Sequence, residues 1–338
     1  MVSNGGVPTS EDSVDWVPLY LVSLLLAAFL LVIAAVGQQA PAAPADPGPS
    51  SGKPAPRAIR PAPPASSAPT PAGPEVPRTL PGGAARIFTG DRVLVAYYGT
   101  AGTGSLGVLG EGSPEQIMPR LIRAAAPFAR GGRPVQPVFE LIATVVHGSP
   151  GKDRDFNADI PRAQVQRYID AAHHHGALLI LDLQPGRADF LSVAKRWEWA
   201  LKDPWVGLAL DPEWRMRPRQ VPGRVIGSVA AAEVNRVSAW LEDLTVREGL
   251  PEKVFLLHQF RTSMIRGIER VRPRPHLAMV QHVDGFGPPR AKLATFRAVI
   301  RPSQFALGFK LFYDEDVPRM RPERVLRIRP RISFVSFQ

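Results

Sequence analysis

The chain has 338 residues, of which 45% are hydrophobic, enough for a sizeable core, so a fibrous or wholly disordered protein is excluded. It has no cysteine, which excludes disulfides, thiolate metal sites and a cysteine nucleophile. The net charge of +11 comes mainly from arginine scattered among acidic residues, and this pattern indicates solvated surface rather than a nucleic-acid partner.

The first predicted element is a membrane helix. After a short tail at 1–15, residues 16–37 carry no charge, and their length suits a helix that crosses about 30 Å of hydrocarbon. The flank before them is acidic and not basic, which favours an uncleaved anchor over a signal peptide. A weak cleavage site at Ala43-Pro44-Ala45 leaves cleavage as the alternative.

The second element is a linker rich in proline and alanine at 38–85, which cannot bury apolar surface and is expected to be extended. We predict a single-pass protein of the cell membrane whose folded domain is extracytoplasmic, because such a tether suits a target away from the bilayer. The basic residues Lys53, Arg57 and Arg60 follow the helix and favour the opposite orientation.

Residues 86–338 alternate short apolar runs with amphipathic stretches, the pattern of repeated βα units. The eight predicted strands are 92–98, 135–143, 177–183, 206–211, 253–259, 276–282, 305–312 and 332–337. The predicted helices are 113–128, 162–174, 189–201, 230–248 and 290–300. Eight strands in about 250 residues predict an α/β fold, a (β/α)8 TIM barrel. The glycine-rich turn at 99–112 leaves an open doubly wound sheet as the alternative.

Active residues of such barrels collect at the carboxyl ends of the strands, and the predicted strands end in polar residues. Asp182, Asp211 and Glu213 lie at two neighbouring strand ends, where alternation places Asp211 and Glu213 on one face, roughly 6.5 Å apart along the backbone. Cleavage of a glycosidic bond needs a protonated acid and a second carboxylate at about this separation. We therefore predict these three as catalytic. The predicted substrate-binding residues are Tyr98, Glu140, Gln184, Trp214, His258, Gln259, Gln281, Asp284, Lys310 and Asp314.

No metal and no cofactor are predicted. The run His173-His174-His175 resembles a metal tract, but it lies at the end of a predicted helix, where imidazoles interact favourably with the helix dipole. His258 and His282 with Asp211 leave a metal-dependent hydrolase as an open alternative.

The segments LILDLQPG, LALDPEW and FKLFYDED resemble strand ends of glycoside-hydrolase (β/α)8 barrels. From about residue 92 to 338, the chain also resembles an uncharacterised family of exported or membrane-anchored actinobacterial proteins. The glycosidase resemblance implies that Glu213 is the general acid, Asp211 its partner and Asp182 a supporting carboxylate. The longer D-x-x-D-x-D-x-E run of chitinase-like enzymes is absent.

These observations together predict a membrane-anchored hydrolase of a polysaccharide or cell-wall polymer. The alternative from another class is a noncatalytic barrel that binds carbohydrate.

Overall fold

The computed structural model describes residues 78–338. The predicted membrane helix at 16–37 and most of the predicted linker at 38–85 lie outside the described residues. Within 78–338, no helix has the length and apolar character needed to cross a membrane.

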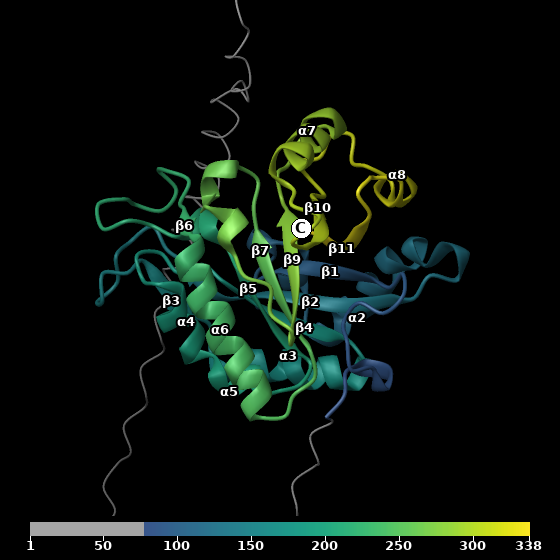
Figure 1. The fold of residues 1–338 in the computed structure, drawn as a ribbon, viewed down its shortest axis with the longest axis horizontal. Helices are drawn as coiled ribbons and strands as arrows, with labels where there is room; N and C mark the ends of the chain where they lie inside the picture. Colours follow the sequence, from purple (N-terminus) through teal and green to yellow (C-terminus); the bar gives the residue numbers. More distant parts are fainter. Residues whose placement is uncertain (1–77) are drawn as a thin grey trace, which may run out of the picture.

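Eight parallel strands form a closed barrel of the TIM type (Figure 1). In barrel order they are β1 (Val93–Gly99), β2 (Val135–Val146), β4 (Leu178–Leu183), β5 (Val206–Leu210), β7 (Lys253–His258), β9 (Leu277–Val283), β10 (Ala306–Leu311) and β11 (Ile332–Phe337). Pairing of β11 with β1 and of β1 with β2 closes the sheet. The eight predicted strands and the barrel are confirmed, and the open sheet is excluded. Strand β2 runs three residues beyond its predicted end because its last residues pair with the antiparallel β3 (Asn157–Asp159).

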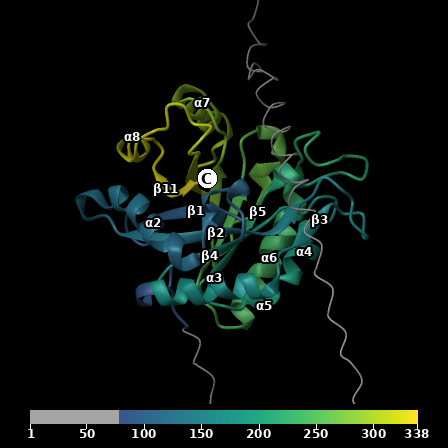
Figure 2. The same ribbon diagram turned by 180° about the vertical axis from the view of Figure 1, so that it is seen from behind.

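The described helices are α2 (Pro114–Ala125), α3 (Arg162–His175), α4 (Phe190–Arg196), α5 (Glu198–Leu201), α6 (Ala231–Arg247), α7 (Pro289–Val299) and α8 (Pro322–Leu326). A short parallel pair, β6 (Val229–Ala230) with β8 (Ile265–Arg266), lies outside the barrel. Helices α3 to α6 lie along one side of the barrel, and α7 and α8 lie on the other (Figures 1 and 2).

Three of these helices differ from the predicted set. The predicted helix at 189–201 is broken into α4 and α5 at Trp197, whose backbone leaves helical geometry. The indole Nε1 of Trp197 donates a hydrogen bond of 2.9 Å to Thr144 Oγ1 on β2, which holds the break against the barrel. Helix α8 was not predicted because five residues are too few to show a helical repeat.

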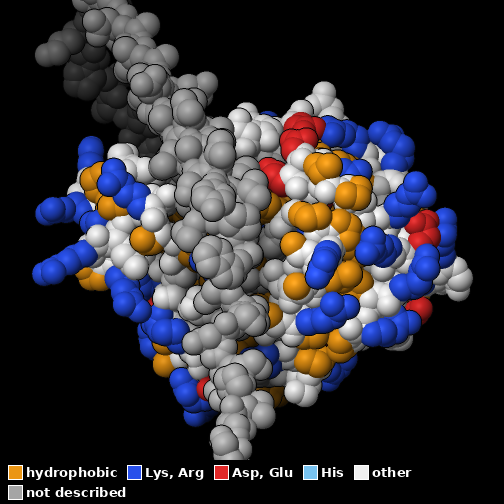
Figure 3. All heavy atoms as spheres, turned by 90° about the horizontal axis from the view of Figure 1, so that it is seen from above, with side chains coloured by type: hydrophobic (Ala, Val, Ile, Leu, Met, Phe, Trp, Pro, Cys, Tyr) orange, Lys and Arg blue, Asp and Glu red, His pale blue; other side chains and the backbone are white. Residues whose placement is uncertain are grey.

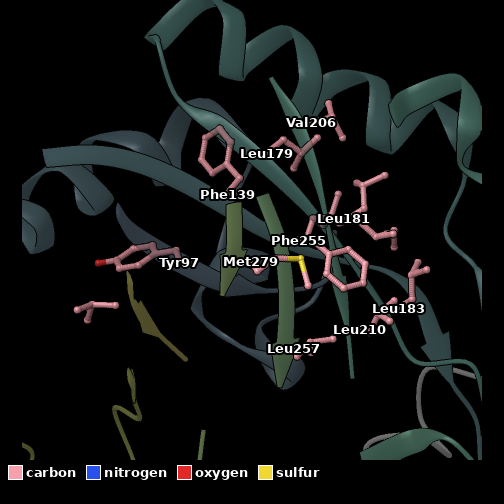
Figure 4. Close-up of a cluster of buried hydrophobic side chains, with 14 of the residues drawn as sticks. Tyr97, Phe139, Leu179, Leu181, Leu183, Val206, Leu210, Phe255, Leu257 and Met279 are labelled. Carbon is pink, nitrogen blue, oxygen red and sulfur yellow. The ribbon is translucent and has the colours of Figure 1, made fainter. Parts of the chain in front are cut away.

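The main hydrophobic core lies between the barrel and its helices (Figure 4). It is formed by side chains that point outward from the strands, among them Phe139 on β2, Leu181 on β4 and Phe255 on β7. A second, smaller core fills the amino-terminal half of the barrel interior with inward-pointing side chains such as Val138, Ile180 and Leu256. Because strand side chains alternate, each strand contributes to both cores.

The chain between the predicted linker and the barrel also packs. Leu80 and Ile87 are buried in the core of the barrel interior. Trp205 Nε1 donates a hydrogen bond of 2.8 Å to the carbonyl oxygen of Thr79. The end of the stretch at 38–85, expected to be extended, is therefore attached to the amino-terminal end of the barrel, because Leu80 supplies apolar surface that the rest of the linker lacks.

Candidate active site

The barrel interior becomes polar at the same level on every strand. On each strand, a polar residue follows two positions after the last apolar residue that points into the barrel. Each of these polar residues is at most 4% exposed. We call these eight residues the polar ring: Tyr98, Glu140, Asp182, Asp211, His258, His282, Lys310 and Ser336. Eight buried polar groups at one level are costly to desolvate, and stability alone gives no reason to assemble them. The ring is therefore the candidate functional site.

His258 is the centre of the ring. Its Nδ1 lies 2.9 Å from Asp284 Oδ2, and its Nε2 lies 3.2 Å from Glu140 Oε1 and 3.7 Å from Asp182 Oδ1. The register pairs His258 with His282 on β9, and their ring centres are 5.0 Å apart. Strands β2, β4, β7 and β9 thus bring two imidazoles and two carboxyl groups to one point in the lumen.

Lys310 and Tyr98 form the opposite side of the ring. Lys310 Nζ lies 3.5 Å above the centre of the Tyr98 ring, 3.2 Å from Gln338 Oε1 and 4.0 Å from Asp284 Oδ2. The Tyr98 hydroxyl donates a hydrogen bond of 2.9 Å to Asp182 Oδ2. Lys310 is therefore the one ammonium group of the ring, and it faces a predominantly acidic set of neighbours.

Three carboxyl groups of the site have a pKa above their usual value. Burial raises the pKa of Glu213 to about 7 and the pKa of Asp182 to about 6. Burial also holds the pKa of Asp211 well above its usual range, and the neighbouring Asp182 and Glu213 add to this shift. Glu213 differs from the other two in being a partly exposed residue, whereas Asp182 and Asp211 are buried.

Two other carboxyl groups favour the ionised form. Burial alone raises the pKa of Glu140, but His282 and His258 outweigh it and bring this pKa below its usual range. At Asp284, burial is outweighed mainly by the hydrogen bond from His258, and the pKa is lowered. Protonated and ionised carboxyl groups therefore lie side by side, the arrangement by which a site separates an acid from a base.

The two histidines respond oppositely to the same surroundings. Burial lowers the pKa of His282 to about 4, so this imidazole is neutral. Burial and Lys310 also lower the pKa of His258, but the carboxylates of Asp182, Asp284 and Glu140 outweigh them and raise it well above its usual value. The centre of the ring therefore attracts positive charge.

Most of the predicted site residues do meet. Tyr98, Glu140, Asp182, Asp211, His258 and Lys310 belong to the ring, and Asp284 contacts it. Gln184 joins it from β4, where its side-chain oxygen accepts a hydrogen bond of 3.1 Å from the Val146 amide and its Nε2 lies 3.5 Å from the Tyr98 hydroxyl.

Four predicted binding residues are not brought to the site. Gln281 donates to Gln259 and to the carbonyl of Val299, and it accepts from the amide of Arg301, so both glutamines lie in the helix layer. They have the opposite strand phase from His258 and His282 and therefore point out of the barrel. Trp214 is only 5% exposed and offers no free face to a sugar. Asp314 lies exposed in the loop after β10.

Strand alternation was also the wrong basis for placing Asp211 and Glu213 together. Strand β5 ends at Leu210, and Asp211 caps a short 3-10 turn at Pro212–Trp214. Asp211 Oδ1 accepts the Glu213 amide at 3.2 Å. The turn, and not the strand, carries Glu213 over the ring.

Sequence reasoning missed Ser336 and placed the two histidines with Asp211. In the structure their partner is Glu140, and ligand atoms of Glu140, His258 and His282 all lie within 4.8 Å of one another. The inward phase of the strands is the signal that identifies Ser336, because it lies two residues beyond the buried Phe334 on β11.

Gly227 holds the turn that carries Glu213. Its amide donates to the carbonyl oxygen of Glu213 at 2.6 Å, and a Cβ added to it would lie 2.5 Å from that same oxygen. Gly227→Ala is therefore expected to displace the turn and to cost about 1–3 kcal/mol in the free energy of unfolding. Urea unfolding measures the cost, with the exposed Ala232→Ser as control. An unchanged unfolding midpoint for Gly227→Ala would show that the turn relaxes freely.

No protein-family model matches the sequence, and no curated protein matches it.

Proposed function

We propose that the barrel hydrolyses a glycosidic bond, with Glu213 as the general acid. The observation that carries this proposal is a carboxyl group with a pKa raised to about 7, on a partly exposed residue at the carboxyl end of a TIM-type barrel. A general acid has to be protonated near the working pH and reachable by the leaving oxygen. Among the carboxyl groups of the site, Glu213 meets both requirements.

The second carboxylate of the proposed reaction is Asp284. Its Oδ2 accepts a hydrogen bond from His258 Nδ1 at 2.9 Å and lies 4.0 Å from Lys310 Nζ, two contacts that stabilise the anion. After burial, Asp284 is the largest contributor to the raised pKa of Glu213, which places the two groups within electrostatic reach of each other. Asp284 is thus a better partner than Asp211, which favours its neutral form and orients the turn.

The proposed substrate is a polysaccharide or cell-wall polymer, in keeping with the resemblance to glycoside-hydrolase barrels and to exported actinobacterial proteins. The net charge of +11 and the many Lys and Arg side chains on the surface in Figure 3 favour an anionic polymer. In this proposal, residues 16–37 anchor the chain in the cell membrane and residues 38–85 present the barrel outside the cytoplasm.

Release of reducing ends tests this function. The full-length protein is incubated with a panel of bacterial wall and capsular glycans, neutral and anionic, and new reducing ends are measured. The proposal expects release from at least one glycan, with anionic polymers preferred at low salt. Saturable binding to a glycan with no release from any of them would replace the hydrolase with a carbohydrate-binding barrel.

A further inference from the structure

The centre of the polar ring contains a concentration of buried polar atoms without hydrogen-bond partners. Within residues 78–338, seven buried side-chain atoms lack a partner, and all except His175 Nε2 belong to this one cluster. The six are Glu140 Oε1 and Oε2, Asp182 Oδ1, His258 Nε2, His282 Nδ1 and Asp284 Oδ1. Buried polar groups are normally paired, so a cluster of unpaired ones indicates a group that all of them share.

The hydrogen bonds behind the two imidazoles orient their lone pairs. Asp284 Oδ2 accepts from His258 Nδ1, which leaves His258 Nε2 facing Glu140 Oε1 at 3.2 Å and Asp182 Oδ1 at 3.7 Å. Ser336 Oγ lies 3.1 Å from His282 Nε2, which leaves His282 Nδ1 facing Glu140 Oε1 at 3.6 Å. A neutral His258 that donates from Nδ1 presents an Nε2 lone pair to Glu140 and Asp182, and a neutral His282 that donates from Nε2 to Ser336 presents an Nδ1 lone pair to Glu140.

A cation between the facing atoms resolves this arrangement. A proton on His258 Nε2 makes a single hydrogen bond, and it leaves His282 Nδ1 and the second oxygen of Glu140 without a partner. A metal ion takes all three ligands at once and displaces that proton when it binds.

The spacing fits a small first-row ion. Bonds of about 2.0–2.1 Å in a tetrahedron put neighbouring ligand atoms about 3.3–3.4 Å apart. The separations of Glu140 Oε1 from His258 Nε2, 3.2 Å, and from His282 Nδ1, 3.6 Å, bracket this value. Two imidazoles with carboxylate oxygens suit Zn²⁺ and its first-row neighbours, whereas Ca²⁺ and Mg²⁺ prefer oxygen alone.

We propose that Glu140, His258 and His282 bind a divalent first-row metal ion, best matched by Zn²⁺. Asp284 and Ser336 are the outer partners that hold the two imidazole rings in orientation. The ligand side chains are fully buried, and the site shares Asp284 with the proposed hydrolase, whereas the proposed acid Glu213 is not among its ligands. The metal site does not depend on the glycan-hydrolase function.

Metal analysis of the full-length protein tests the site without any substrate. The protein is stripped with a chelator, reloaded with Zn²⁺, freed of excess metal and analysed for metal content. Close to one ion per chain is expected, together with a rise in the unfolding temperature on loading. In the isosteric variant Glu140→Gln we expect the stoichiometric ion to be lost.

Two further variants guard against a folding defect and against metal held elsewhere. Ser336→Ala removes only an outer partner and is expected to weaken Zn²⁺ affinity by about 10–100-fold in a folded protein. The double variant His174→Gln/His175→Gln alters the histidine tract on α3, away from the ring, and is expected to retain the ion. Loading with Co²⁺ is expected to give the visible absorption of a tetrahedral nitrogen and oxygen site in this control but not in Glu140→Gln.

The proposal is overturned if the folded parent retains no Zn²⁺ and gives no Co²⁺ spectrum. It is equally overturned if the metal leaves with the α3 histidines and stays in Glu140→Gln. Neither result depends on whether any glycan is cleaved.

Discussion

Glu213→Gln is expected to lower kcat for glycan hydrolysis by about 10²–10⁴-fold, because an amide cannot deliver the proton that the leaving oxygen needs. The substitution preserves size and the turn that Asp211 and Gly227 hold, so substrate binding is expected to change little. The measurement is a comparison of kcat and of the glycan dissociation constant between parent and variant. The matched control is Glu269→Gln, a surface carboxylate paired only with its neighbour Arg270.

The pH profile supplies the second readout for Glu213. A general acid acts while protonated, and burial raises the pKa of this group to about 7. Activity of the parent is therefore expected to fall as the pH rises through about 7, and this limb is expected to vanish from the residual activity of Glu213→Gln. A variant with full activity, or with the same limb as the parent, contradicts the assignment of Glu213 as the acid.

Phe139→Ala is expected to give the largest loss of stability, about 3–5 kcal/mol in the free energy of unfolding. Phe139 is fully buried on the outward face of β2, and its ring meets Tyr168 of α3 edge to face with centres 5.4 Å apart. It lies among the side chains that join the strands to the helix layer (Figure 4). Removing the ring leaves a cavity, and the closed barrel cannot move inward to fill it.

Urea unfolding followed by circular dichroism measures this loss. The control is Ile122→Ala on α2, whose side chain is 50% exposed and whose removal is expected to change stability by less than about 0.5 kcal/mol. Similar losses for the two variants would show that the helix layer contributes little to holding the barrel together.

Much of the fold is readable from local patterns. Each of the eight barrel strands was predicted, because a buried parallel strand is a short apolar run bounded by turn residues. The start of α2 was equally readable, since Ser113 and Gln116 form the reciprocal capping hydrogen bonds that their spacing predicts. The polar strand ends were also recognised, and most of their side chains do meet in the lumen.

The predictions failed where a strand pattern ends, or where it does not show whether a side chain points into or out of the barrel. Gln259 and Gln281 lie at the ends of the same strands as His258 and His282. Each is one position away from its histidine, and a shift of one position turns a side chain to the opposite face of the strand. Glu213 lies beyond the end of β5, where the cap formed by Asp211 replaces the strand period. Trp214 was predicted to bind substrate, yet it is only 5% exposed in the turn.

The order and type of the strands, the barrel and the polar character of its carboxyl end follow from short segments of sequence, because they depend on the period and composition of each segment. Contacts made on folding bring Glu140, from the far side of the lumen, to His258 and His282, and they raise the pKa of Glu213 while lowering that of Asp284. Contacts across a lumen depend on how the sheet closes, and pKa values depend on burial and on every charge nearby. Both are collective properties that no short segment of the chain contains.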